Sequence, residues 1–107
     1  MQTPRRQWTA TEVLAELERH QPWLRGRGVR VLGLFGSYRH ATPRPDSDLD
    51  FLVDLEQPSF DCYMDVKLWL EDTFGRPVDL VLMESIKPRL RPVILREVVY
   101  AEGLSPL

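Results

Sequence analysis

Cysteine is almost absent from this sequence, which excludes two common ways of stabilising a small domain. The single cysteine, Cys62, can form neither an internal disulfide nor a cysteine-based zinc site. This cysteine content suits a reducing compartment. We therefore expect the protein to act in the cytoplasm.

Long apolar runs and a strong net charge are also missing. No apolar run reaches the roughly 18 residues that a transmembrane helix needs, and the opening MQTPRRQWTATEV lacks the apolar stretch of a signal peptide. The net charge is -2, from 14 basic and 16 acidic residues, so no global electrostatic attraction favours nucleic acid or lipid. We expect a soluble domain with no membrane partner and no direct nucleic-acid binding.

What the sequence does contain is an alternation of helix and strand patterns on the scale of one domain. The 107 residues, 43% of them hydrophobic, suffice for one modest core. We predict a single domain over residues 1–107, with flexible ends at 1–8 and 104–107. The predicted order is helix, strand, strand, helix, strand, helix. This order favours a mixed β-sheet with flanking helices, in the α/β (α+β) class.

The individual elements are predicted from hydrophobic spacing and from capping residues. Thr9 and Glu12 form a predicted capping box, and Pro22 either kinks the first helix or begins a second short one. The next helix has an apolar stripe that begins at Phe60, and the stripe of the last helix extends to Val99. The predicted elements after the first helix are strands over 29–35, 49–55 and 77–83 and helices over 60–74 and about 91–102.

Two aspartates one residue apart begin the second predicted strand. Because side chains alternate along a strand, Asp48 and Asp50 would point to the same face, about 7 Å apart. Carboxylates at this range repel each other, and a bound Mg²⁺ ion relieves the repulsion while keeping sites for water and substrate phosphates. The alternative is a solvated turn, since RPDSD is also a good turn sequence.

Gly36 and Ser37 end the preceding strand, ten residues before the aspartate pair. Glycine lets the backbone approach a ligand closely, and serine adds a hydroxyl and an amide that can bind phosphate oxygens. Gly-Ser is equally a common strand-terminating turn. Folded as a hairpin-like pair, however, the two strands would place a phosphate-binding turn beside a metal site, so the combination is more specific than either part.

A third carboxylate, Asp79, lies within an otherwise apolar strand. One interpretation is an edge-strand residue that faces solvent while its neighbours in the strand face the core. The other places Asp79 beside Asp50 on an adjacent strand, where it could bind a second metal ion or accept a proton from an attacking hydroxyl. The presence of the other two aspartates favours the second interpretation.

The stretch LFGSYRHATPRPDSDLDFLVDL resembles the signature of the minimal nucleotidyltransferases, a branch of the DNA polymerase β-like superfamily, which reads Gly-Ser, ten residues, Asp-x-Asp. The later stretch RPVDLVLMESIKPRLRPVILREVVYAE resembles the rest of that family, with a third aspartate in a strand and a Lys-Pro connection into a final helix. The likeness extends from about residue 12 to residue 103.

The resemblance implies a fold, an activity and a set of site residues. The activity would be Mg²⁺-dependent transfer of AMP from ATP to a hydroxyl, with two metal ions. By matching positions, Gly36 and Ser37 would hold the triphosphate, Asp48 and Asp50 the metal ions, and Asp79 would be the third carboxylate.

One segment departs from the family pattern. Family members commonly have Ala-Arg-Gly two to four residues after the serine, where this sequence has Arg39, His40 and Ala41. A guanidinium binds phosphate bidentately, whereas a neutral imidazole cannot. Arg39 or Arg44 could take over this contact, which makes Arg39, His40 and Arg44 candidate nucleotide-binding residues. Otherwise the arginines lie in a solvated loop and turnover is reduced.

Larger enzymes of the superfamily add a domain that grips the acceptor or the base, and the minimal fold takes up the 107 residues of this sequence. The resemblance therefore also implies a partner protein that supplies the acceptor or completes the site. In the family, the usual partner is a helical HEPN-domain ribonuclease toxin, which forms a hetero-oligomer with the nucleotidyltransferase. In such a pair the nucleotidyltransferase is the antitoxin, and it neutralises the toxin by attaching AMP to a tyrosine of the toxin. Two functions stay open: an enzyme that modifies its partner, and a catalytically weak binding module that blocks the partner sterically. A turn-rich domain with no nucleotide role is a third possibility.

Overall fold

A computed structural model describes residues 8–36 and 49–105 of the chain. The helices and strands are α1 (Ala10–Arg19), α2 (Gln21–Gly26), β1 (Val29–Phe35), β2 (Leu49–Leu55), α3 (Phe60–Phe74), β3 (Val78–Leu82), the 3-10 turn η2 (Met83–Ser85), α4 (Arg91–Glu97) and β4 (Val99–Tyr100). Among these described helices, none combines the length and the apolar character that crossing a membrane requires.

The first helix begins where the sequence predicts it. The Glu12 amide donates to Oγ1 of Thr9 (3.1 Å), and the Thr9 amide donates to Oε1 of Glu12 (3.0 Å), which completes the capping box. Pro22 occupies the first turn of α2, where its missing N–H costs nothing. It therefore begins a second short helix rather than kinking the first.

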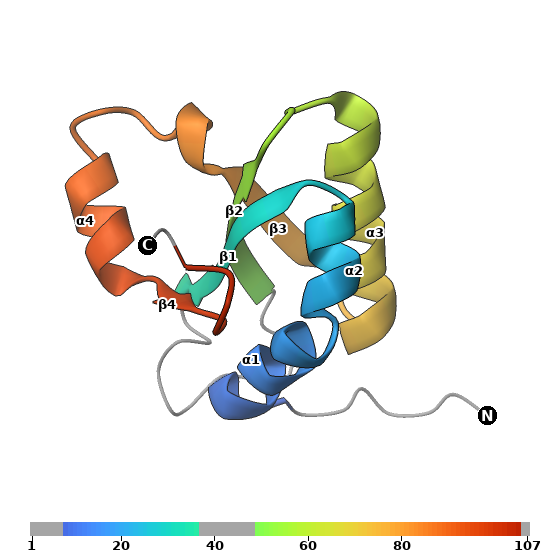
Figure 1. The fold of residues 1–107 in the computed structure, drawn as a ribbon. Coiled ribbons are helices and arrows are strands. Elements are labelled where there is room, and N and C mark those ends of the chain that lie inside the picture. The colour runs from blue at the N-terminus through green and yellow to red at the C-terminus, as the bar shows by residue number, and fades with distance from the viewer. Residues whose placement is uncertain (1–7, 37–48, 106–107) are drawn as a thin grey trace.

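The described strands form one mixed sheet in the order β3-β2-β1-β4. β1 pairs antiparallel with both β2 and β4, while β2 and β3 run parallel and are joined by α3. Figure 1 shows α2 and α3 on one side of the sheet and α4 on the other. The predicted mixed sheet with flanking helices is confirmed.

Each face of the sheet carries its own apolar cluster. The larger cluster joins the strands to α1, α2 and α3; its largest fully buried side chain is Phe51, which stacks on Phe74 with ring centroids 5.9 Å apart. The smaller cluster lies under α4 and contains Leu52, Ile86 and Val98. Because successive side chains of β2 point to opposite faces, Phe51 belongs to the first cluster and Leu52 to the second.

The predicted last helix, 91–102, is wrong in its C-terminal half. α4 ends at Glu97, Val98 is extended (φ -78°, ψ 135°), and Val99 and Tyr100 form β4 against Gly33 and Leu34 of β1. Gly33 makes this pairing possible, since a Cβ there would lie 3.0 Å from Cδ1 of Tyr100 and still closer to Cγ1 of Val98. The predicted strand 77–83 is observed as the shorter β3, followed by η2.

Three further expectations need correction. Trp8, assigned to a flexible end, is buried and donates its indole N–H to the Phe74 carbonyl (3.2 Å). Leu104, at the other predicted end, is fully buried, and its carbonyl accepts the Leu32 amide (2.9 Å). Phe60, placed on the apolar stripe of α3, is the first residue of that helix and is 76% exposed.

Candidate functional site

The strand register brings two of the predicted site residues together. Asp50 of β2 is the register partner of Asp79 of β3. Register partners on adjacent parallel strands point to the same face, and such strands lie about 4.8 Å apart. The two aspartates are therefore neighbours, and both side chains leave the sheet on the face that carries α4. Asp50 is half-buried and Asp79 is exposed. β3 is at one edge of the described sheet, so Asp79 is both beside Asp50 and open to solvent.

Gly36 completes this part of the site from the end of β1, the strand that pairs with the other edge of β2. It follows β1 directly, and the preceding residue, Phe35, is the register partner of Asp50. Gly36 has φ +79°, a conformation that glycine adopts without strain. A Cβ at this position would lie 3.2 Å from Cγ of Asp50 and still closer to its Oδ2. The bare glycine backbone therefore lies against the Asp50 carboxylate.

Several hydrogen bonds fix the beginning of β3, on which Asp79 lies. The Leu49 amide donates to the Pro77 carbonyl (3.2 Å), and the Val78 amide donates to Oε2 of Glu71 on α3 (3.2 Å). Further along the same strand, the Tyr63 hydroxyl donates to the Leu80 carbonyl (2.7 Å). The two α3 side chains satisfy backbone groups of β3, the edge strand of the described sheet.

These positioning residues were not predicted from the sequence. The contact between Glu71 and Val78 depends on the chain reversal at Gly75, which has φ +67° and ends α3. A glutamate seven residues before a strand carries no sequence signal of such a contact.

The remaining predicted site residues lie outside the described residues. They are Ser37, Arg39, His40, Arg44 and Asp48. Within residues 8–36 and 49–105, no three His, Cys, Asp or Glu side chains converge as a metal site. The described donors are two carboxylates on one sheet face, and carboxylate oxygens are ligands that suit Mg²⁺. The described part of the site therefore fits a magnesium ion.

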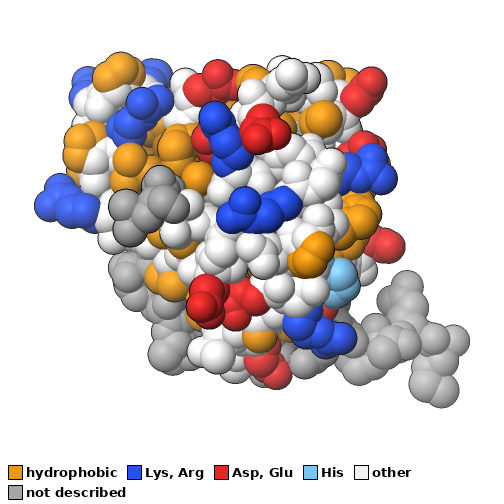
Figure 2. Space-filling view, viewed as in Figure 1, with side chains coloured by type: hydrophobic (Ala, Val, Ile, Leu, Met, Phe, Trp, Pro, Cys, Tyr) orange, Lys and Arg blue, Asp and Glu red, His pale blue; other side chains and the backbone are white. Residues whose placement is uncertain are grey.

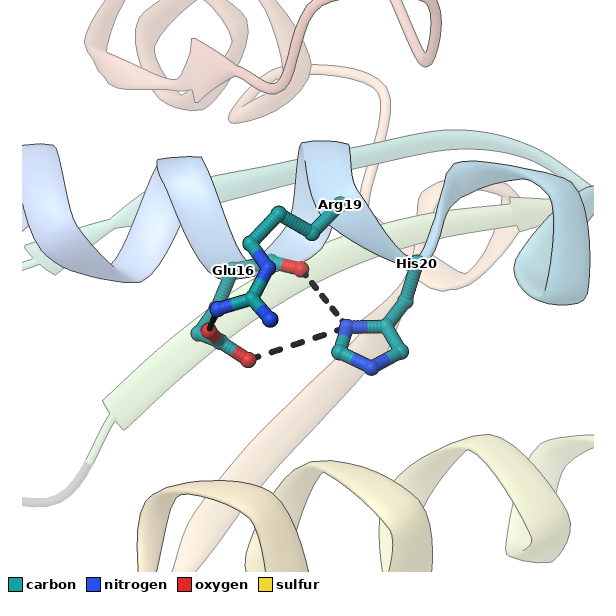
Figure 3. A network of polar contacts seen from close by, with 3 residues as sticks. All are labelled: Glu16, Arg19 and His20. Carbon is teal, nitrogen blue, oxygen red and sulfur yellow. Dashed lines mark hydrogen bonds and ion pairs between the residues drawn. The ribbon is translucent and has the colours of Figure 1, made fainter.

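A second polar cluster lies on the other side of the sheet and is separate from this site. Nδ1 of His20, at the end of α1, is 3.0 Å from the Glu16 carbonyl oxygen and 3.7 Å from its Oε2, while Arg19 pairs with Glu16 at 2.8 Å (Figure 3). The His20 ring meets Trp69 edge to face, 5.1 Å between centroids. His20 therefore ends a helix and packs against α3, and it is half-buried.

The fold is that of a nucleotidyltransferase domain. The profile of the nucleotidyltransferase domain family matches residues 11–101, and the chain belongs to this family. It is similar to the protein adenylyltransferase MntA of Thermococcus cleftensis, with 43% identity over 94 residues that cover 86% of this chain and 95% of the relative.

Solved structures agree with this assignment. A structure assigned to the minimal nucleotidyltransferases superposes with a TM-score of 0.75 and 32% identity, covering 86% of this chain and 95% of that chain. The complex of a tri-AMPylated HEPN toxin with an MNT antitoxin, from Shewanella oneidensis, contains a chain that matches with a TM-score of 0.58. That match has 20% identity and covers 84% of this chain and 72% of that chain, so it shows a common fold.

Proposed function

We propose that this chain transfers AMP from ATP to a tyrosine hydroxyl of a HEPN-type toxin and so acts as its antitoxin. The observation that carries the proposal is the pairing of Asp50 with Asp79 on one sheet face, with the Gly36 backbone against Asp50. The name of the Thermococcus relative, a protein adenylyltransferase, supports the reaction class. The AMP-modified toxin in the Shewanella complex supports the kind of acceptor.

In this proposal, Asp48, Asp50 and Asp79 hold two Mg²⁺ ions. Bound there, magnesium neutralises phosphate charge and orients the reacting groups. Gly36 and Ser37 approach the triphosphate through backbone amides and a hydroxyl. The triphosphate is also contacted by the basic side chains of the segment between Gly36 and β2, namely Arg39, His40 and Arg44.

The proposed reaction forms one bond and breaks one. The acceptor hydroxyl oxygen bonds to the α-phosphorus of ATP, the bond between that phosphorus and the α,β-bridging oxygen breaks, and pyrophosphate leaves. The proton of the hydroxyl passes to the Asp79 carboxylate, which is exposed and so accessible to an acceptor from outside the chain.

The transfer can be tested with ATP labelled at the α- or the γ-phosphate, incubated with Mg²⁺, this chain and the HEPN-domain protein of the same genome. Only the α-label should appear on the HEPN protein. Asp79→Asn should lower the labelling rate at least about 100-fold, the usual scale for losing a general base. Asp72→Asn removes an exposed carboxylate from α3 and should leave the rate unchanged. Equal labelling by the two variants would contradict the role of Asp79.

A second candidate function is neutralisation of the toxin by steric blocking, without AMP transfer. It is favoured by the segment Arg39-His40-Ala41, which lacks the Ala-Arg-Gly that the family commonly has there and so lacks the usual phosphate-binding arginine. If His40 occupies the place of a phosphate-binding arginine, His40→Arg should strengthen Mg-ATP binding or raise the transfer rate. A wild-type chain that binds and silences its partner without transferring label would establish the steric function instead.

A further inference from the structure

We infer that α4 and the turn before it form the surface on which the acceptor protein docks, and that this surface fits an acidic protein patch with an apolar centre. The inference rests on the proposed function, since it assigns a docking surface for the acceptor of that reaction. The residues of this α4 surface are Lys87, Arg89, Leu90, Arg91, Val93 and Arg96.

The centre of the α4 surface is apolar and exposed. Leu90 is 45% exposed and Val93 is 49% exposed, whereas Ile94 and Leu95 turn inward and pack on the cluster around Leu52. Figure 2 shows hydrophobic side chains over α4 with basic side chains around them. Burial of such side chains by a partner removes apolar area from water, which favours association.

The rim of the α4 surface is cationic, and the exposed carboxylates that flank it in sequence, Glu84 and Glu97, form no described ion pair with it. Residues 87–96 contain four cations and no carboxylate. None of the four forms an ion pair with a carboxylate in the part of the chain that the structure describes; Arg91 instead donates to the Met83 carbonyl (3.1 Å). Four cations elsewhere are each paired with a carboxylate at 2.8–3.3 Å: Arg19 with Glu16, Arg27 with Asp65, Arg30 with Asp54 and Lys67 with Glu71.

This contrast indicates the charge of the partner. In a chain of net charge -2, the α4 surface gathers four cations that have no described carboxylate partner, and a complementary acidic surface would be attracted to it. An apolar centre within a polar rim is the usual arrangement of a protein–protein interface, and arginine is enriched in such interfaces. Single-stranded nucleic acid would gain most from aromatic side chains on which bases stack, and residues 87–96 contain none. A protein partner is therefore favoured over RNA.

The position of α4 links docking to the reaction. Leu52 and Val81, in the cluster beneath α4, come two residues after Asp50 and Asp79 on the same strands and the same face. Two residues along a strand span about 7 Å. A protein held on the outer side of α4 would thus extend over the carboxylate pair, and a hydroxyl at its border could reach the site.

The test is a charge reversal with a matched control. Lys87→Glu with Arg89→Glu reverses two rim charges whose side chains make no described hydrogen bond; Arg19→Glu with Arg27→Glu makes the same change in charge on the opposite side of the sheet. Affinity for the HEPN-domain protein of the same genome is measured by calorimetric titration without ATP. The α4 variant should bind at least about tenfold more weakly, and the control should bind as the wild type does.

The outcomes separate this inference from the proposed function. If the wild type transfers AMP and the α4 variant binds the partner as tightly as the control, the docking surface is wrong and the proposed function stands. If the wild type neither binds nor modifies the partner, both fail. Affinity for single-stranded oligouridine is measured for the same proteins. If the α4 variant loses affinity for this RNA and keeps its affinity for the partner, the surface binds RNA and the inference is overturned. Should the double variant lose its melting transition, Val93→Asp and Arg96→Glu are measured in its place.

Discussion

Replacing Gly36 by alanine perturbs the candidate site at the point where the backbone lies against Asp50. Two effects follow from the structure. The φ of +79° is unfavourable for a residue with a Cβ and costs about 1–2 kcal/mol of stability. The added Cβ would also lie 3.2 Å from Cγ of Asp50 and closer still to Oδ2, so the carboxylate must move.

The two effects have different sizes and different readouts. The backbone cost should lower the melting temperature by about 4–8 °C for each kcal/mol in a domain of this size. Displacement of the Asp50 carboxylate removes its contact with bound Mg-ATP. We take the value of a hydrogen bond to a charged group, about 1.5–3 kcal/mol, as the size of this loss. That loss corresponds to roughly 10–100-fold weaker Mg-ATP binding, measured by calorimetry below the melting temperature.

Gly28 provides the matched control for this experiment. Its φ is +88°, and a Cβ there would have no described heavy atom within 4 Å. Gly28→Ala should therefore show the same kind of loss in melting temperature and unchanged affinity for Mg-ATP. If Gly36→Ala binds Mg-ATP as tightly as Gly28→Ala does, the glycine does not shape the nucleotide site and the reasoning is refuted.

Two further predictions concern the metal and the pH dependence. Asp50→Asn should abolish the Mg²⁺-dependent part of the rise in melting temperature that ATP causes, because only the folded site binds the ligand; an undiminished shift would place the metal elsewhere. Burial raises the pKa of Tyr100 above its ordinary value of 10.0, so the folded state favours the neutral phenol. The resulting stability is present below pH 10.0 and is lost as pH rises through the folded pKa. Tyr100→Phe should make the melting temperature fall less steeply above that pH, and an unchanged slope would contradict the assignment.

The parts of the fold that were predicted correctly depend on short-range interactions. The capping box of Thr9 and Glu12 joins residues three apart, and Gly75 ends α3 through its own left-handed conformation. The pairing of Asp50 with Asp79 was anticipated only because three aspartates and a resemblance pointed to it. Hydrophobic spacing alone gives no strand order.

The parts that were not predicted depend on long-range contacts. Val98 and Val99 fit a helical stripe, but these β-branched residues continue as a strand because Gly33 leaves room for Val98 beside β1. Trp8 belongs to the core because its indole N–H reaches the Phe74 carbonyl, 66 residues away. Likewise, the exposure of Leu90 and Val93 follows from which side of α4 meets the sheet, which helical spacing does not determine.

The most direct test of the proposed function is the intact mass of the HEPN-domain partner after incubation with this chain, ATP and Mg²⁺. Transfer of AMP predicts a partner whose mass rises in increments of one AMP, and almost no increment when Asp79→Asn replaces the wild type. A partner that forms the complex and loses its ribonuclease activity while its mass stays unchanged would contradict the enzymatic account.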